Sequence, residues 1–183
     1  MKMKRIILTI LLLNFIIIAN AQDNVLKPLS VGDTMPSIVL DSVMGFNKSS
    51  LKMSDYKNKL VILDFWATWC HWCIEAFPKN DSLQKKFGNQ LLIMLVDCKE
   101  TNDTRQKIVE FYKKRRAAGK EVRLPTIYSD TVLLQLFPHK LIPHYVWIKD
   151  GIIKAITESE EVTAINIQKM LKGEQVRLTL KPE

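Results

Sequence analysis

Two cysteines separated by two residues, Cys70 and Cys73, are the residues of this chain best suited to chemistry. An apolar stretch over residues 60–65 precedes them and is typical of a buried strand, and a helical pattern begins where they stand. This spacing places both sulfurs on the first turn of a helix, close enough to form a small disulfide or to hold one reactive thiolate. A C-x-x-C pair in this setting is typical of redox chemistry.

A purely structural disulfide would suit this spacing less well. A bridge over two residues closes a very small loop and removes little chain entropy from the unfolded state. A close, exposed pair is better suited to switching between the dithiol and the disulfide. We therefore interpret the pair as redox-active.

The elements that must position this pair alternate between strands and helices. We expect strands at 60–66 and 91–97, helices at 70–86 and 104–118, a short helix between Asp130 and Phe137, a hairpin of strands 145–148 and 152–156, and a last helix that Thr163 caps and Gly173 ends. The pattern predicts the α/β class, with a central mixed β-sheet flanked by helices on both faces.

The region before the first long strand predicts an N-terminal β-hairpin extension. Residues 37–40 and 48–51 flank a turn at Gly45. Ser54 is expected to cap a short helix that follows.

The start of the chain predicts a signal peptide over residues 1–21. Lys2, Lys4 and Arg5 precede an apolar core, residues 6–18, and an A-x-A site predicts cleavage after Ala21. The core is shorter than the about 20 residues that span a bilayer. We therefore expect an exported, periplasmic protein, with an uncleaved membrane anchor as the alternative.

Composition places one domain after this leader. The chain carries 27 basic and 19 acidic residues, and loss of the three leader cations lowers its net charge from +8 to +5. This modest positive charge gives no reason to expect nucleic-acid binding, and it supports at most peripheral contact with a membrane. We expect a linker at 22–30, one domain at 31–173 and a tail at 174–183.

The run from Asp64 to Cys73, D-F-W-A-T-W-C-H-W-C, resembles the active-site strand and turn of thioredoxins. Pro78 lies where thioredoxins kink the following helix, and residues 141–144 resemble their cis-proline loop. The export signal and the extra N-terminal segment indicate the TlpA/ResA-like branch of exported thiol-disulfide oxidoreductases. The resemblance covers about residues 31–172. It implies a thioredoxin fold and a redox-active Cys70–Cys73 disulfide that exchanges with protein substrates.

The resemblance and the position of the pair assign three catalytic residues. The helix N-terminus favours a thiolate at Cys70, the expected nucleophile, although the dipole supplies only about 0.3–1 kcal/mol. Cys73 is expected to resolve the mixed disulfide. Asp64, buried with a raised pKa, would be its base. Thioredoxins have aspartate here and many TlpA-like relatives have asparagine, so Asp64 could instead be a structural polar residue.

Five neighbours are expected to support the site or bind substrate: Trp69, His71, Trp72, Ile142 and Pro143. His71 could stabilise the Cys70 thiolate when protonated, or it could face solvent and tune affinity. Trp69 is expected to pack over the site, and Trp72 stands where thioredoxins most often have proline. Ile142 would expose backbone to a bound polypeptide if Pro143 is cis.

Other interpretations stay open for several residues. Pro143 could be an ordinary trans proline that opens a strand. TlpA/ResA-like proteins often have glutamate where this chain has Ala76, and Glu75 lies about 100° away around the helix. Cys98 could be a buried inert thiol or a regulatory one.

The resemblance favours reduction of protein disulfides, with electrons from a membrane thiol carrier and with no cofactor or metal. One alternative is a copper-binding module that uses Cys70, Cys73 and either His139 or His144. Another is an interaction module of the same fold without turnover.

Overall fold

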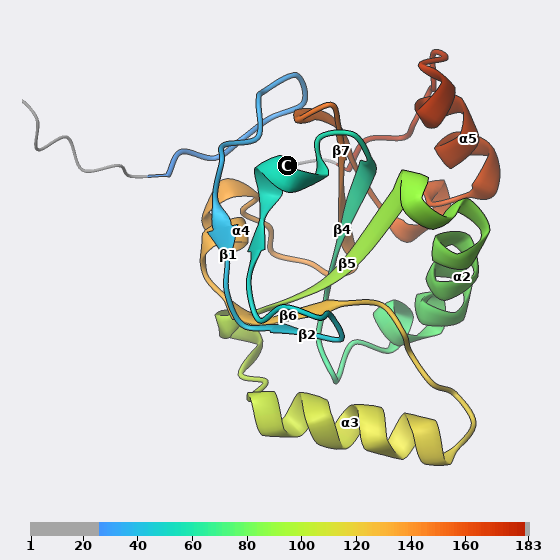
Figure 1. The fold of residues 1–183 in the computed structure, drawn as a ribbon. Helices are drawn as coiled ribbons and strands as arrows, with labels where there is room; N and C mark the ends of the chain where they lie inside the picture. The colour runs from blue at the N-terminus through green and yellow to red at the C-terminus, as the bar shows by residue number, and fades with distance from the viewer. Residues whose placement is uncertain (1–25, 182–183) are drawn as a thin grey trace, which may run out of the picture.

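The computed structural model describes residues 26–181 (Figure 1). The expected signal peptide, residues 1–21, and its cleavage after Ala21 lie outside the described residues. No helix between residues 26 and 181 is long and apolar enough to cross a membrane.

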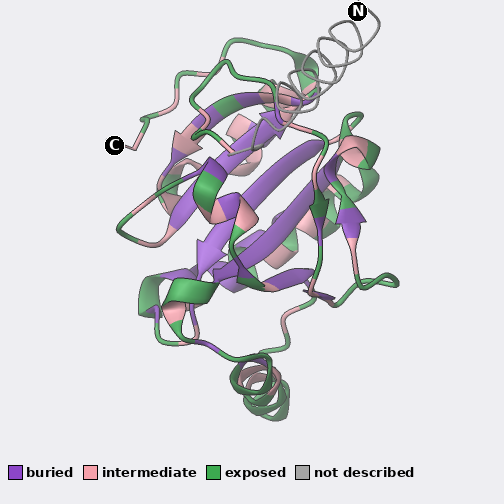
Figure 2. Ribbon diagram, turned by 90° about the vertical axis from the view of Figure 1, so that its left-hand side faces the viewer, coloured by how far each residue is buried: buried purple, intermediate pink, exposed green. Residues whose placement is uncertain are grey.

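A mixed six-stranded sheet forms the centre of the fold, as predicted. Its strands, in spatial order, are β2 (Val43–Met44), β6 (Thr126–Asp130), β5 (Leu91–Cys98), β4 (Leu60–Trp66), β7 (His144–Lys149) and β8 (Ile152–Thr157). β4 runs parallel to β5 and antiparallel to β7. Every residue of β4 and β5 is buried, because helices or loops cover both faces of these strands (Figure 2).

Successive side chains of β4 point to opposite faces and so divide the core in two. Ile62 and Trp66 face the side covered by α2 (His71–Phe87), which we call the α2 face. α3 (Arg105–Ala117) and α5 (Ala164–Lys172) also pack against this cluster. Leu63 and Phe65 face the other side, which we call the far face, where the short helix α4 (Val132–Leu136) and the N-terminal segment pack. Helices therefore cover both faces (Figure 1).

The N-terminal extension differs in part from the predicted hairpin. β1 (Val39–Leu40) pairs with β3 (Leu51–Lys52) in a separate two-stranded sheet. The short β2 between them joins the edge of the main sheet through β6. β6 itself is missing from the prediction, because its sequence, TIYSD, alternates weakly and carries few apolar residues.

The predicted caps are largely confirmed. The Thr163 hydroxyl accepts the amide of Asn166 at the start of α5, and Gly173 ends that helix with a left-handed φ of 72°. The prediction that Ser54 caps a helix is wrong: a 3₁₀ turn spans Met53–Tyr56, and no side chain caps it. The hairpin turn at Gly151 forms as expected, with φ 74°.

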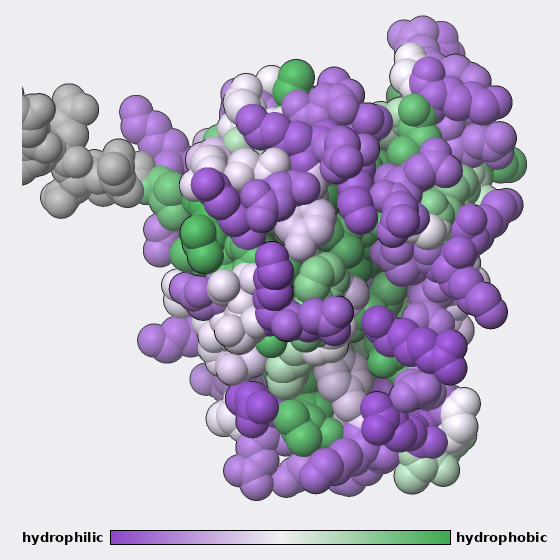
Figure 3. Space-filling view, in the orientation of Figure 1, coloured by the Kyte–Doolittle hydropathy of each residue, from purple (hydrophilic) through white to green (hydrophobic). Residues whose placement is uncertain are grey.

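Two isolated bridges flank the outer edge of the sheet. Thr34 pairs with Ile152 at one end of β8, and Leu180 pairs with Thr157 at the other. Hydrophilic side chains cover most of the face seen in Figure 3, and hydrophobic ones show only in separate places. This surface has the mixed polarity expected of a folded domain.

Candidate active site

The cysteine pair lies where β4 ends and α2 begins. Cys70 is the N-cap of α2, and its Sγ accepts the amide hydrogen of Cys73 at 3.3 Å. The two cysteines form a disulfide, with their Cα atoms 5.4 Å apart. Because the first amides of a helix have no partners within it, this position stabilises negative charge on the Cys70 sulfur in the reduced protein.

The two cysteines differ in access to solvent. Cys70 keeps 6% of its surface exposed and Cys73 keeps none. The Sγ atom of Cys73 lies 3.9 Å from the carbonyl oxygen of Phe65, under the start of the helix. The prediction of an exposed pair is therefore wrong for the disulfide form, but Cys70 is the outer sulfur, as expected.

Asp64 lies fully buried on the α2 face of the sheet, the side on which Cys73 also packs. Its Oδ2 accepts a hydrogen bond from Asn80 Nδ2 at 2.9 Å, and its Oδ1 has no partner among the described residues. Burial raises the pKa of Asp64 to about 8, although the Asn80 amide and the nearby Tyr145 hydroxyl oppose this rise. The carboxyl group is thus largely protonated at neutral pH and can exchange a proton with a thiol.

Asn80 and Tyr145 complete this buried group, and sequence reasoning missed both. Asn80 Nδ2 also lies 3.3 Å from the Tyr145 hydroxyl oxygen. Asn80 follows Cys73 by seven residues and so lies on the same face of α2. The seven-residue spacing of Asn80 from Cys73 could have indicated Asn80 from the sequence. Tyr145 can be identified only from the structure, where it pairs with Asp64 across β4 and β7.

We expect Asn80→Ala to destabilise the protein by about 2 kcal/mol, because the Asp64 carboxyl would lose its hydrogen-bond donor in a buried position. Urea denaturation at pH 7 would measure the change. Ser82→Ala, an exposed substitution on the same helix, is the control and should change stability by less than about 0.5 kcal/mol. Equal stability of both variants would show that Asn80 does not support the carboxyl group.

The cis-proline loop lies between α4 and β7. The Ile142–Pro143 peptide bond is cis, which confirms the prediction for this bond. The Ile142 side chain is partly buried and packs against the cores on both faces, whereas Leu141 is 72% exposed. The loop therefore places one anchored residue and one exposed apolar residue beside the sheet.

The side chains between and before the cysteines face outward. Trp72 is 73% exposed, and the ring of His71 packs edge-on against it at 5.5 Å. Trp69 is 63% exposed, and its Nε1 donates to the Thr101 carbonyl at 3.1 Å, which ties its ring to the turn that follows β5. No hydrogen bond of the described residues joins His71 to Cys70, which favours the solvent-facing interpretation of this histidine.

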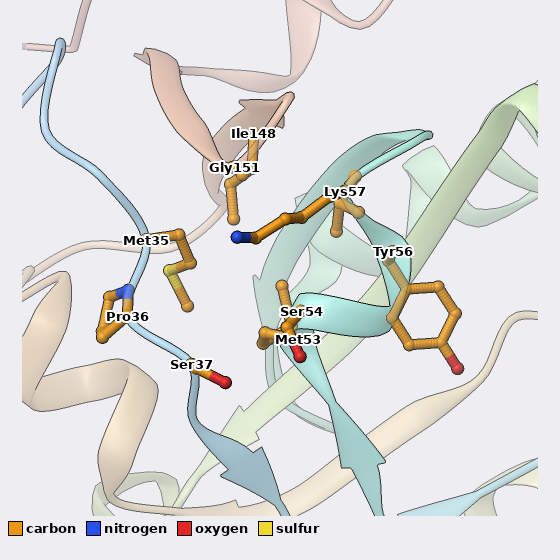
Figure 4. Close-up of a pocket in the computed structure, with 10 residues that line it drawn as sticks. Met35, Pro36, Ser37, Met53, Ser54, Tyr56, Lys57, Ile148 and Gly151 are labelled. Atoms are coloured by element: carbon orange, nitrogen blue, oxygen red, sulfur yellow. The ribbon is translucent and has the colours of Figure 1, made fainter.

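An open hollow of about 520 Å³ adjoins these residues. It is lined by Trp72, Glu75, Ala76, Lys79, Pro143, Glu158, Ser159 and Glu160. It therefore brings α2, the cis-proline and the segment after β8 together around one surface. A much smaller space, about 10 Å³, lies among Met35, Met53 and Lys57 (Figure 4), where about one water would fit.

The ligands of the copper alternative are not brought together. The rings of His139 and His144 stack with centroids 4.4 Å apart and pack against Phe65, on the far face. Cys70 and Cys73 pack on the α2 face. Among residues 26–181, no group of three or more His, Cys, Asp or Glu side chains is placed to hold a metal ion.

Cys98 ends β5 as a free, buried thiol. Burial, with the nearby Asp130 and Asp97 carboxylates, raises its pKa well above the usual range. A thiol that stays protonated is a poor nucleophile. This environment favours the interpretation of Cys98 as inert.

Comparisons with known proteins agree with this geometry. The family model described as Thioredoxin matches residues 42–112. The thioredoxin-like protein YneN of Bacillus subtilis is 34% identical over 80 residues, which cover 44% of this chain and 45% of YneN. The thiol-disulfide oxidoreductase ResA of the same organism is 36% identical over 64 residues, which cover 35% of this chain and 34% of ResA. The chain thus spans less than half the length of these curated relatives.

A solved structure extends the likeness to most of the fold. The pneumococcal exposed lipoprotein thioredoxin of Streptococcus pneumoniae is similar with a TM-score of 0.60 and 24% identity, over 75% of this chain and 99% of that one. At this identity the match shows the fold alone. The architecture is therefore the thioredoxin fold, with the small N-terminal sheet added to it.

Proposed function

We propose that this chain, which has the thioredoxin fold and resembles ResA-type proteins around the cysteine pair, is a thiol–disulfide oxidoreductase that exchanges disulfides with exported proteins through Cys70 and Cys73. One observation carries the proposal. The disulfide lies at the N-cap of α2 with only its outer sulfur accessible, above a face of the sheet that holds a buried carboxyl group. Exchange requires an accessible cysteine that attacks the substrate first and a second cysteine that then releases it, and Cys70 and Cys73 are exposed in that order.

The first step forms a mixed disulfide. In the reduced protein, the Cys70 thiolate attacks one sulfur of a substrate disulfide. A bond forms between Cys70 and that sulfur, the substrate S–S bond breaks, and the departing substrate sulfur takes up a proton. The helix N-terminus stabilises the attacking thiolate, and the backbone at Ile142 is proposed to hold the substrate chain.

The second step releases the substrate. Asp64 accepts the thiol proton of Cys73, and the resulting thiolate attacks the Cys70 sulfur. A bond forms between Cys73 and Cys70, the mixed disulfide breaks, and the second substrate sulfur leaves as a thiolate that takes up a proton from water, so that Cys70 and Cys73 are left oxidised. Two electrons have passed to the substrate. Since the pKa of Asp64 is about 8, the ionised base becomes more abundant as the pH rises toward that value.

Reduction of substrates is the direction that we propose, with electrons returned by a membrane thiol carrier. The expected leader over residues 1–21 supports an exported, periplasmic location. Residues 31–173 are proposed as the thioredoxin-like domain, between a linker at 22–30 and a tail at 174–183. Trp69, Trp72 and Pro143 are proposed to contact the substrate.

Trapping of the mixed disulfide tests this function. In a Cys98→Ala background, Cys73→Ala should accumulate a covalent adduct with a purified polypeptide that carries a disulfide, because no resolving thiol remains. Non-reducing electrophoresis would show the adduct, and a thiol reductant would remove it. Cys70→Ala with Cys73→Ala is the control and should form none. Absence of the adduct, together with no acceleration of insulin reduction by the wild type, would contradict the proposal.

A further inference from the structure

The chain after α5 returns to the sheet and approaches the candidate site. In Figure 1 the red segment that follows α5 runs back toward β7. Leu180 pairs with Thr157 at the end of β8, and the Lys181 amide donates to the Ile156 carbonyl at 2.9 Å. These bonds fix where the Lys181 side chain begins.

The ammonium group of Lys181 has three donors, and each has an acceptor. Nζ lies 2.9 Å from the Leu141 carbonyl oxygen, 2.8 Å from that of Pro143 and 3.1 Å from Glu158 Oε1. The side chain is only 9% exposed. A lysine whose donors are all used and whose stem is covered is held in one place, unlike an ordinary surface lysine.

The two carbonyls belong to the residues on either side of Ile142. Among residues 26–181, no backbone–backbone hydrogen bond involves residues 138–142, between the end of α4 and the start of β7. Packing of the Ile142 and His139 side chains holds this stretch, together with the Lys181 contacts to the carbonyls of Leu141 and Pro143. Without the lysine, the carbonyls on both sides of Ile142 would lose their donor.

Lys181 also connects the loop to the hollow beside Trp72. Its third partner, Glu158, lines that hollow together with Pro143. On the opposite side, Lys79 Nζ donates to the Ser159 carbonyl at 2.6 Å and ties the same wall to α2. Lys181 thus connects the cis-proline loop to the segment after β8, which lines the hollow together with α2.

We propose that Lys181 is a positioning residue for polypeptide substrates: it sets the cis-proline loop against the segment after β8, so that a substrate chain meets a preformed surface. The inference rests on the proposed function. Lys181 contacts neither cysteine in the hydrogen-bond pattern of the described residues. It therefore serves recognition of a chain and leaves the sulfur chemistry unchanged.

The test compares a polypeptide disulfide with a small aromatic disulfide as oxidants of the reduced protein. Lys181→Met keeps the apolar stem and removes the donors. It should raise KM for the polypeptide about tenfold, the equivalent of one charge-assisted hydrogen bond, with kcat and the small-disulfide rate within about twofold of wild type. Lys181→Arg, which keeps donors in a different geometry, should lie between.

Lys172→Met is the matched control, because Lys172 is 59% exposed and pairs only with Glu174, at 3.7 Å, among the described residues. It should leave both rates unchanged. An unchanged polypeptide KM in Lys181→Met, or an equal loss on both oxidants, would overturn the proposal.

Backbone NMR order parameters separate this proposal from the proposed function. The order parameters of Leu141 and Ile142 should fall in Lys181→Met relative to wild type, whether or not the protein is active, because the carbonyls of Leu141 and Pro143 lose their donor. Unchanged order parameters would overturn the role of Lys181 while leaving the oxidoreductase function intact. A wild type that reacts with neither oxidant would instead overturn the oxidoreductase function.

Discussion

Cys70→Ala should lower the rate of disulfide exchange by on the order of a thousandfold or more, to the uncatalysed rate, because the substitution removes the nucleophile. Cys73 cannot replace it, since its side chain has no exposed surface and lies beneath the start of α2. Turbidity from insulin reduction in the presence of a thiol donor would measure this loss.

Cys98→Ala is the matched control for that experiment. This cysteine is equally small and buried, but it ends β5 as a free thiol with a strongly raised pKa. Its replacement should leave the exchange rate within about twofold and cost about 1 kcal/mol of stability from lost packing. If Cys98→Ala abolishes exchange while Cys70→Ala does not, the assignment of the nucleophile is wrong.

Asp64→Asn should act in opposite directions on stability and on turnover. The folded-state pKa of Asp64, about 8, lies above the unfolded value near 3.8, so the folded protein binds the extra proton between these pH values. Wild-type stability therefore falls as the pH rises from about 4 to 8, and the asparagine variant lacks this loss. Relative to pH 4, the variant should gain about 5 kcal/mol over wild type at pH 8.

Turnover should fall in the same variant, because an asparagine amide cannot accept the thiol proton of Cys73. Release of the mixed disulfide should slow by on the order of a hundredfold, as quenched-flow measurements would show. Asp41→Asn, an exposed substitution, is the control for both measurements. An Asp64→Asn variant with the wild-type pH slope would show that this carboxyl group is not the buried proton carrier.

The sequence predicts the parts of the site that are local in the chain. The strand before Cys70, the helix after it and the hairpin at Gly151 each follow from a short pattern of apolar residues and turn formers. The burial of Asp64 follows in the same way, because a continuous apolar strand is covered on both faces, and alternation places Asp64 on the same face as Trp66. Such features need no knowledge of which strands become neighbours.

The parts that could not be predicted depend on contacts between distant segments. Tyr145 meets Asp64 only through the register of β7 against β4, and Lys181 reaches the proline loop only because the chain after α5 turns back. The copper alternative required His139 or His144 to lie near the cysteine pair. This was wrong for the same reason, because the register of β7 against β4 places His144 on the far face. Spacing in the chain carries no information on such pairings.

The bridges at the two ends of β8 limit how this protein can associate. An edge strand with free amides and carbonyls invites another chain to extend the sheet, the route to stacked aggregates. Here Thr34 and Leu180 each occupy one end of the edge, and the exposed charge of Lys154 stands between them. The opposite edge, β2, has only two residues. Both edges of the sheet are thereby protected from pairing with the β-structure of another chain.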